Sequence, residues 1–141
     1  FCGVGSFTFS LALSGKRRSV TAVESDPRAV ELLQYAVGQS GSPVKVVKRD
    51  LFRQPLVGDE LSSFDLVVFD PPRAGALAQS ETLAIDGPEW IIAVSCNPAT
   101  FSRDMRVLRL LAAIEILLLQ AFPYCSPVTL ERFGMFPKAP F

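Results

Sequence analysis

The chain has 141 residues, of which 49% are hydrophobic, and its 14 basic and 14 acidic residues cancel. This length and composition exclude a disordered chain and predict one folded domain with a sizeable core. A net charge of zero gives no support for nucleic-acid binding by this segment alone.

Apolar runs predict strands that alternate with helices along the whole chain. A glycine-rich turn, FCGVGSF, opens the sequence and leads into a helix. Near-continuous valine, isoleucine and leucine indicate strands buried on both faces, hence an α/β, Rossmann-like parallel sheet with helices on each side. Because the glycine turn lacks the strand that should precede it, we expect a fragment whose first strand is missing or truncated. The predicted strands are 20–24, 44–48, 64–70, 90–96 and 114–122.

Two of the predicted helices have clear boundaries or faces. Asp26 can cap the first, with Pro27 at its first helical position, and Gly38 is expected to end it. The second is predicted over 100–113, where an apolar face is expected to pack on the sheet: Met105, Leu108 and Leu111. Arginines recur every third residue on the same helix and predict a solvated face: Arg103, Arg106 and Arg109.

Polar residues follow the glycine turn at the ends of successive strands. Gly3 and Gly5 let backbone amides approach a ligand, but the turn is not the GxGxxG of NAD-binding proteins and favours another nucleoside cofactor. Glu24 ends the next strand, where a carboxylate can bind ribose hydroxyls, and Asp50 ends the one after it. This edge is predicted to hold the adenosine half of S-adenosylmethionine. The alternative is that Glu24 or Asp50 caps a neighbouring helix.

Two later apolar runs end in reactive residues beside proline: VVFDPPRAG at 67–75 and IIAVSCNPAT at 91–100. Parallel strands deliver such residues to one edge of a sheet, so we expect Asp70 and Cys96 to share a cleft. A helix N-terminus is predicted just after Cys96, where its dipole and free amides favour a thiolate. The alternative is an unreactive, buried cysteine.

Residue types that are absent narrow the chemistry further. The chain has no histidine, and its three cysteines form no CxxC pair, which argues against a zinc site or a disulfide framework. Without histidine, only carboxylates, lysines, arginines and thiols remain for proton transfer and nucleophilic attack. No run of about 18 apolar residues and no signal peptide occur, which predicts a cytoplasmic protein without a membrane span.

The motifs FCGVGSF, AVESD, DPPRAG and SCNPAT follow one another in an order and spacing that resemble the RNA uracil-5-methyltransferases, across nearly the whole chain. The resemblance implies a class I methyltransferase fold and an enzyme that uses S-adenosylmethionine to make 5-methyluridine in rRNA or tRNA. It implies that residues 1–141 are one catalytic domain, the C-terminal part of a longer protein. RNA, the implied partner, would be bound largely by an upstream region, which carries an iron–sulfur cluster in some members. We expect this segment to bind RNA poorly alone, with no metal site.

The same resemblance implies roles for single residues. Uracil C5 is a poor nucleophile, and addition of a thiolate to C6 lets C5 attack a sulfonium methyl group. Cys96 is similar to that thiol, and Glu131 to the base that then removes the C5 proton. The segment 126–136 around Glu131 lacks the family's histidine and has one extra residue. Asp70 resembles an aspartate beside the methyl donor and the target base. The implied cofactor contacts are Phe1, Gly3, Gly5, Ser6, Glu24, Asp50 and Asp70.

Two other functions remain open. A cytosine C5 methyltransferase would use the same thiol chemistry, although DPPR, the glutamate and the lack of a second cysteine motif argue against it. A non-catalytic remnant would keep the Rossmann-like core to bind a nucleoside cofactor or a partner. Whether Cys96 and Glu131 face one pocket separates catalysis from the remnant. The target RNA and the oligomeric state are left open.

Overall fold

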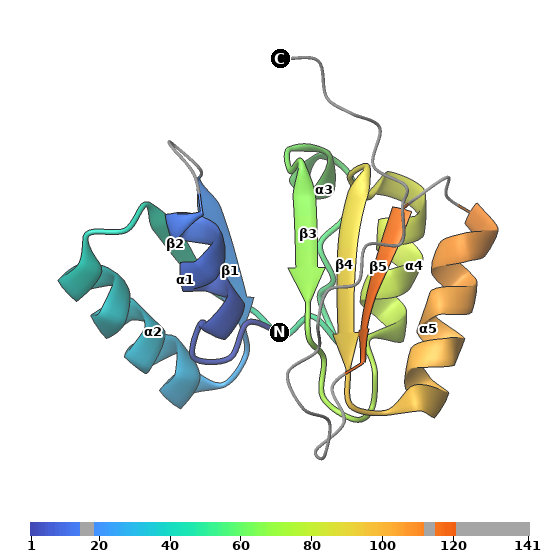
Figure 1. Ribbon diagram of the computed structural model, residues 1–141, viewed down its shortest axis with the longest axis horizontal. Coiled ribbons are helices and arrows are strands. Elements are labelled where there is room, and N and C mark those ends of the chain that lie inside the picture. The colour runs from blue at the N-terminus through green and yellow to red at the C-terminus, as the bar shows by residue number, and fades with distance from the viewer. Residues whose placement is uncertain (15–18, 112–114, 121–141) are drawn as a thin grey trace.

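The computed structural model describes residues 1–14, 19–111 and 115–120, in which helices and strands alternate (Figure 1). All strand pairs among these residues are parallel, so the α/β prediction is confirmed. No helix in the described part of the chain is both long enough and apolar enough to cross a membrane. The elements are α1 (Ser6–Leu13), β1 (Val20–Glu24), α2 (Pro27–Ser40), β2 (Val44–Lys48), α3 (Asp59–Ser62), β3 (Leu66–Phe69), α4 (Leu77–Asp86), β4 (Trp90–Ser95), α5 (Pro98–Leu111) and β5 (Glu115–Gln120).

The described strands form two sheets where we expected one. Strand β1 pairs with β2, and β4 lies between β3 and β5. No described residue pairs β1 with β3. Instead, residues of the glycine turn bond to the end of β1: the backbone nitrogens of Phe1 and Cys2 donate to the Val23 carbonyl at 2.7 and 3.2 Å. The start of the glycine turn therefore lies between the two sheets (Figure 1).

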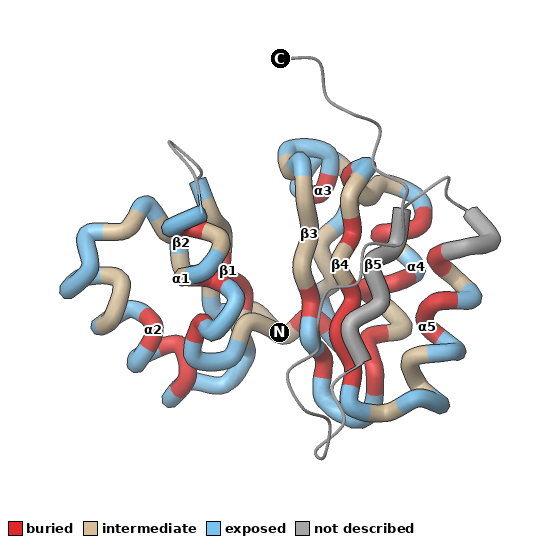
Figure 2. The backbone as a smooth tube through the Cα atoms, viewed as in Figure 1, coloured by how far each residue is buried: buried red, intermediate tan, exposed pale blue. Residues whose placement is uncertain are grey.

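The larger sheet carries the main core. Helices α4 and α5 lie together on one face of β3, β4 and β5 (Figure 1), and the residues between these layers are buried (Figure 2). Leu83 of α4, Ile91 of β4 and Leu108 of α5 are at most 1% exposed. Burying one such side chain contributes about 1.5–3 kcal/mol, so this packing fixes the strand ends relative to the helices.

Helix α2 begins as predicted but ends later. The Asp26 side chain accepts a hydrogen bond from the Arg28 amide at 3.1 Å, and Pro27 takes the first helical position. The helix runs through Gly38 to Ser40 and stops at Gly41, whose φ of 61° is the left-handed conformation that ends helices. The predicted end at Gly38 is wrong, because the backbone of Gly38 stays helical.

Helix α5 begins before the predicted Thr100. The Asn97 side chain accepts from the Ala99 amide at 3.1 Å and caps the helix, which starts at Pro98. Met105 and Leu108 are buried, as the apolar periodicity predicts, whereas the Leu111 and Arg109 side chains lie outside the described part. Exposed positions for Arg103 and Arg106 are confirmed, but the Arg103 guanidinium also pairs with a buried carboxylate, that of Asp104.

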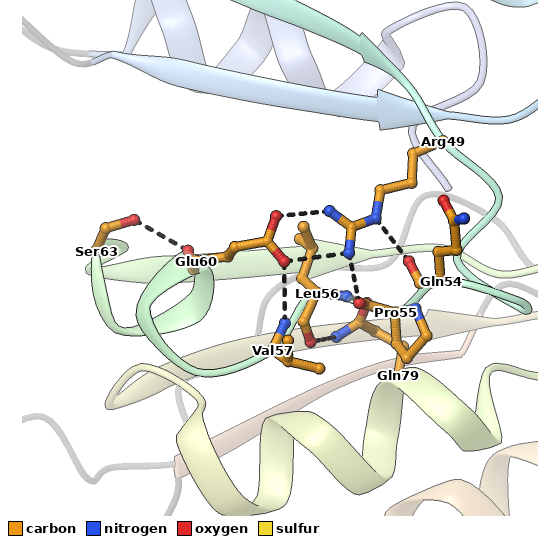
Figure 3. A network of polar contacts seen from close by, with 8 residues as sticks. All are labelled: Arg49, Gln54, Pro55, Leu56, Val57, Glu60, Ser63 and Gln79. Carbon is orange, nitrogen blue, oxygen red and sulfur yellow. Dashed lines mark hydrogen bonds and ion pairs between the residues drawn. The ribbon is translucent and has the colours of Figure 1, made fainter.

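A polar network connects the segment after β2 with helices α3 and α4 (Figure 3). The Arg49 guanidinium lies 2.6 Å from the Glu60 carboxylate and donates to both carbonyls of 54–55. Gln79, buried in α4, accepts from the Leu56 amide at 2.9 Å and donates to the Leu56 carbonyl. The network thereby anchors the chain that leaves β2 to the helices of the larger sheet.

Candidate active site

The glycine turn is packed tightly at one glycine and open at the other. Gly5 has a φ of 97°, and a Cβ there would lie 2.5 Å from Leu33 Cδ1 and 3.2 Å from the Phe9 ring. Gly3 has a φ of 54°, and a Cβ there would meet nothing within 4 Å. The turn thus rests on α2 through Gly5, whereas the space beside the Gly3 Cα is open. The Gly3 amide itself is engaged, because it donates to the Glu24 carboxylate.

The two glycines should therefore respond differently to alanine. We expect Gly5→Ala to destabilise the fold by about 2–4 kcal/mol, because backbone strain adds to the clash with Leu33. Gly3→Ala, the matched control, should cost about 1 kcal/mol through its positive φ alone. Urea denaturation of both variants measures the difference. Equal losses would contradict the packing role of Gly5.

Glu24 is tied directly to the glycine turn. Its carboxylate accepts from the amides of Gly3 at 2.8 Å, Ser25 at 2.7 Å and Asp26 at 3.1 Å. Burial opposes ionisation of this carboxyl, but those three amides lower the pKa of Glu24 below its usual value. The side chain is therefore a carboxylate at neutral pH. It does not cap α2, because Asp26 has that role.

The segment after β2 reaches the same turn. The Asp50 carboxylate accepts from the Phe52 amide at 3.0 Å and lies 3.6 Å from Arg53. The exposed Phe52 ring meets the Phe1 ring edge-on, with centroids 5.1 Å apart. This contact brings Asp50 and Phe1 into one region. Phe52 was not among the residues predicted for the site, because its place there comes from the tertiary contact with Phe1.

Asp70 and Cys96 follow neighbouring parallel strands. Phe69 at the end of β3 lies opposite Ala93 of β4, which continues to Ser95. Partial burial raises the pKa of the Asp70 carboxyl above its usual value. Cys96 is a free, exposed thiol and therefore not the buried cysteine of the alternative; its reactivity stays a prediction.

The other two predicted residues are less well defined. Ser6 is exposed and begins α1 directly after the glycine turn. Glu131 lies outside the described residues, so its pairing with Cys96 stays a prediction. The structure thus gathers Phe1, Gly3 and Glu24 with the Asp50 segment, and it places Asp70 and Cys96 just after the ends of two neighbouring strands, β3 and β4.

Comparisons with known proteins point to one kind of chemistry. Residues 1–86 match the model of the methyltransferase small domain family. The chain is 49% identical over 110 residues to an uncharacterized RNA methyltransferase of Rhizobium meliloti, a match that covers 77% of this chain and 26% of that protein. It is 33% identical to the 23S rRNA (uracil(1939)-C(5))-methyltransferase RlmD of Vibrio vulnificus, over 98% of this chain and 32% of that protein.

A solved structure is also similar. It is the tRNA (uracil-54, C5)-methyltransferase of Pyrococcus abyssi in complex with S-adenosyl-L-homocysteine. Its TM-score to this chain is 0.65 at 32% identity, and the match covers 76% of this chain and 26% of that one. The chain spans about a quarter to a third of the length of the curated relatives described above.

Proposed function

The chain belongs to the methyltransferase small domain family, and we propose that it is the catalytic part of an S-adenosylmethionine-dependent enzyme that methylates C5 of uridine in rRNA or tRNA. The observation that carries the proposal is the exposed Cys96 thiol at the end of β4, next to the strand that Asp70 follows. Two similar proteins, 33% and 32% identical, are named as uracil C5 methyltransferases, which supports this specificity. The parallel strand pairs fit a Rossmann-like class I methyltransferase fold.

The glycine turn and its neighbours fit the cofactor. S-adenosylmethionine supplies an electrophilic methyl group on a sulfonium. The open space beside the Gly3 Cα would admit the ligand, and the ionised Glu24 carboxylate would accept hydrogen bonds from ribose hydroxyls. Phe1, Gly5, Ser6 and Asp50 would complete the adenosine side of the site. Asp70 would lie toward the methyl group and the base.

The thiol chemistry follows from the position of Cys96. The cysteine directly follows β4, lies two residues before α5, and has a free, exposed thiol. Cys96 would add its sulfur to C6 of uracil, and the C5–C6 electron pair would then form the new C5–methyl bond. The bond between the methyl group and the sulfonium sulfur would break at the same time, and S-adenosylhomocysteine would leave with that electron pair. Glu131 would take the C5 proton. Those C5–H electrons would restore the double bond as the C6–sulfur bond breaks and the thiolate leaves.

The rest of the proposal concerns the protein that carries this chain. Base extraction needs a positive surface and aromatic platforms, and a segment with no net charge supplies mainly the pocket. We therefore place RNA binding largely outside residues 1–141, with this chain as a single C-terminal catalytic domain of a cytoplasmic enzyme.

Product analysis tests the proposal together with Glu24. The full-length protein, given S-adenosylmethionine and transcripts of 23S rRNA and tRNA, should form 5-methyluridine, measured by nucleoside mass spectrometry. Glu24→Gln should raise the KM for S-adenosylmethionine by about tenfold or more, because a charge-assisted hydrogen bond to the ribose is weakened.

Glu31→Gln, on an exposed position of α2, is the matched control and should keep the wild-type KM. An unchanged KM in Glu24→Gln would remove the ribose role. Formation of 5-methylcytidine would favour the cytosine alternative, and no methylated product with any transcript would favour the non-catalytic remnant.

A further inference from the structure

We propose that Asp104 is a positioning residue that holds the 73–76 loop, which follows Asp70, against α5, so that Asp70 and Cys96 keep a fixed relation during methyl transfer. The inference rests on the proposed function. Asp104 is an unusual residue for this position, since it lies in an amphipathic helix and only 2% of its surface is exposed. A buried carboxylate is costly unless it is paired and hydrogen-bonded, so its partners indicate its role.

Both partners of Asp104 bear on the loop. The Ala76 amide donates to Asp104 Oδ2 at 2.6 Å in a buried contact. The Arg103 guanidinium lies 2.7 Å from Asp104 Oδ1 and donates to the Ala74 carbonyl at 3.0 Å. Asp104 therefore holds the loop directly at Ala76, and it holds Ala74 indirectly through Arg103.

A second set of bonds joins the loop to the residue after the thiol. The Arg73 carbonyl accepts from Asn97 Nδ2 at 2.9 Å and from Thr100 Oγ1 at 3.1 Å. Asn97 directly follows Cys96, and Arg73 is the third residue after Asp70. The bond between Asn97 and Arg73 is thus a direct link between the segments that carry the two reactive side chains.

Gly75 shows how closely the loop lies on the helix. Its φ is 79°, and a Cβ there would lie 2.5 Å from Asp104 Oδ2, 2.6 Å from Arg103 Nη2 and 3.0 Å from Thr100 Cβ. The loop backbone is therefore pressed against the helix turn that holds it. Stability alone does not require a buried ion pair here, because apolar residues often serve as well. A defined loop geometry does require directed hydrogen bonds.

Variants of the full-length protein test this role. Asp104→Asn should lower kcat for methylation of the rRNA and tRNA transcripts by about tenfold or more, since small misplacements in a catalytic site are costly. The KM for S-adenosylmethionine should stay within about twofold, because Glu24 and the glycine turn are not part of these contacts. Asp65→Asn, on an exposed aspartate, is the control and should keep the wild-type kcat.

Thr100 gives a milder test in case Asp104→Asn does not fold. Thr100→Val removes the hydroxyl that donates to Arg73 and should lower kcat by about three- to tenfold, whereas Thr100→Ser should restore it. Ser102→Ala, on an exposed neighbouring position of α5, is the matched control. If a folded Asp104→Asn keeps the wild-type kcat, or if Asp104→Asn does not fold and Thr100→Val keeps it, the positioning role is wrong.

Amide exchange separates failure of this inference from failure of the proposed function. If the wild type methylates no transcript, the proposed function fails, and exchange of the Ala76 amide decides the inference. Faster exchange of the Ala76 amide in Asp104→Asn than in Asp65→Asn would support the inference that Asp104 holds the loop. Equal exchange in the two variants would overturn it.

Discussion

Replacing Cys96 by alanine should abolish methyl transfer by the full-length protein. We expect kcat to fall by about three orders of magnitude or more, since without addition of a thiol to C6 the C5 atom stays a poor nucleophile. Cys96 is exposed and lies just before α5, so a uracil base can reach its thiol. Binding of S-adenosylmethionine should be retained, because the glycine turn and Glu24 do not contain the thiol.

Cys125→Ala is the control for removal of a cysteine and should keep the wild-type rate. Transfer of a labelled methyl group to the rRNA and tRNA transcripts gives the rates, and calorimetry gives cofactor binding. A Cys96→Ala variant that still makes 5-methyluridine at more than about a tenth of the wild-type rate would contradict nucleophilic catalysis by this residue.

The second large effect concerns proton removal at C5. Glu131→Gln should allow the thiol to add and the methyl group to transfer, but should prevent loss of the C5 proton. Turnover should fall by about 10²–10⁴-fold, the usual contribution of a general base. The methylated adduct should then accumulate on ordinary uridine RNA, where it is detected as a protein–RNA species by denaturing electrophoresis and mass spectrometry.

Glu81→Gln, on an exposed position of α4, provides the comparison and should neither slow turnover nor trap RNA. Glu131→Gln could also lose turnover without a trapped adduct. That result would show that Glu131 acts before or during thiol addition and is not the base that removes the C5 proton.

The apolar runs predicted the secondary structure closely, and the pairing of strands less well. Strands β1 and β2 have the predicted bounds, and β3 is shorter by two residues at its N-terminal end and one at its C-terminal end. These runs report burial, which is a local property of the sequence. Division into two sheets was not predicted, because pairing depends on which segment lies beside β1, and Phe1 and Cys2 lie there.

In the candidate site, too, features set by local sequence could be predicted, whereas those that depend on tertiary contacts could not. The glycine turn and the strand-ending Glu24 could be identified from spacing, and the structure joins them by the bond between Gly3 and Glu24. The role of Asp104 could not be identified. An aspartate beside an arginine in an amphipathic helix usually indicates a solvated face, and only the loop folded against α5 gives Asp104 its partners.

Covalent capture of RNA tests the central claim most directly. The wild type and Cys96→Ala are incubated with S-adenosylmethionine and transcripts that contain 5-fluorouridine, in which fluorine blocks removal of a C5 proton. We predict an adduct with the mass of protein, RNA and one methyl group for the wild type, and none for Cys96→Ala. No adduct from a wild type that makes 5-methyluridine, or an adduct that persists in Cys96→Ala, would contradict the account.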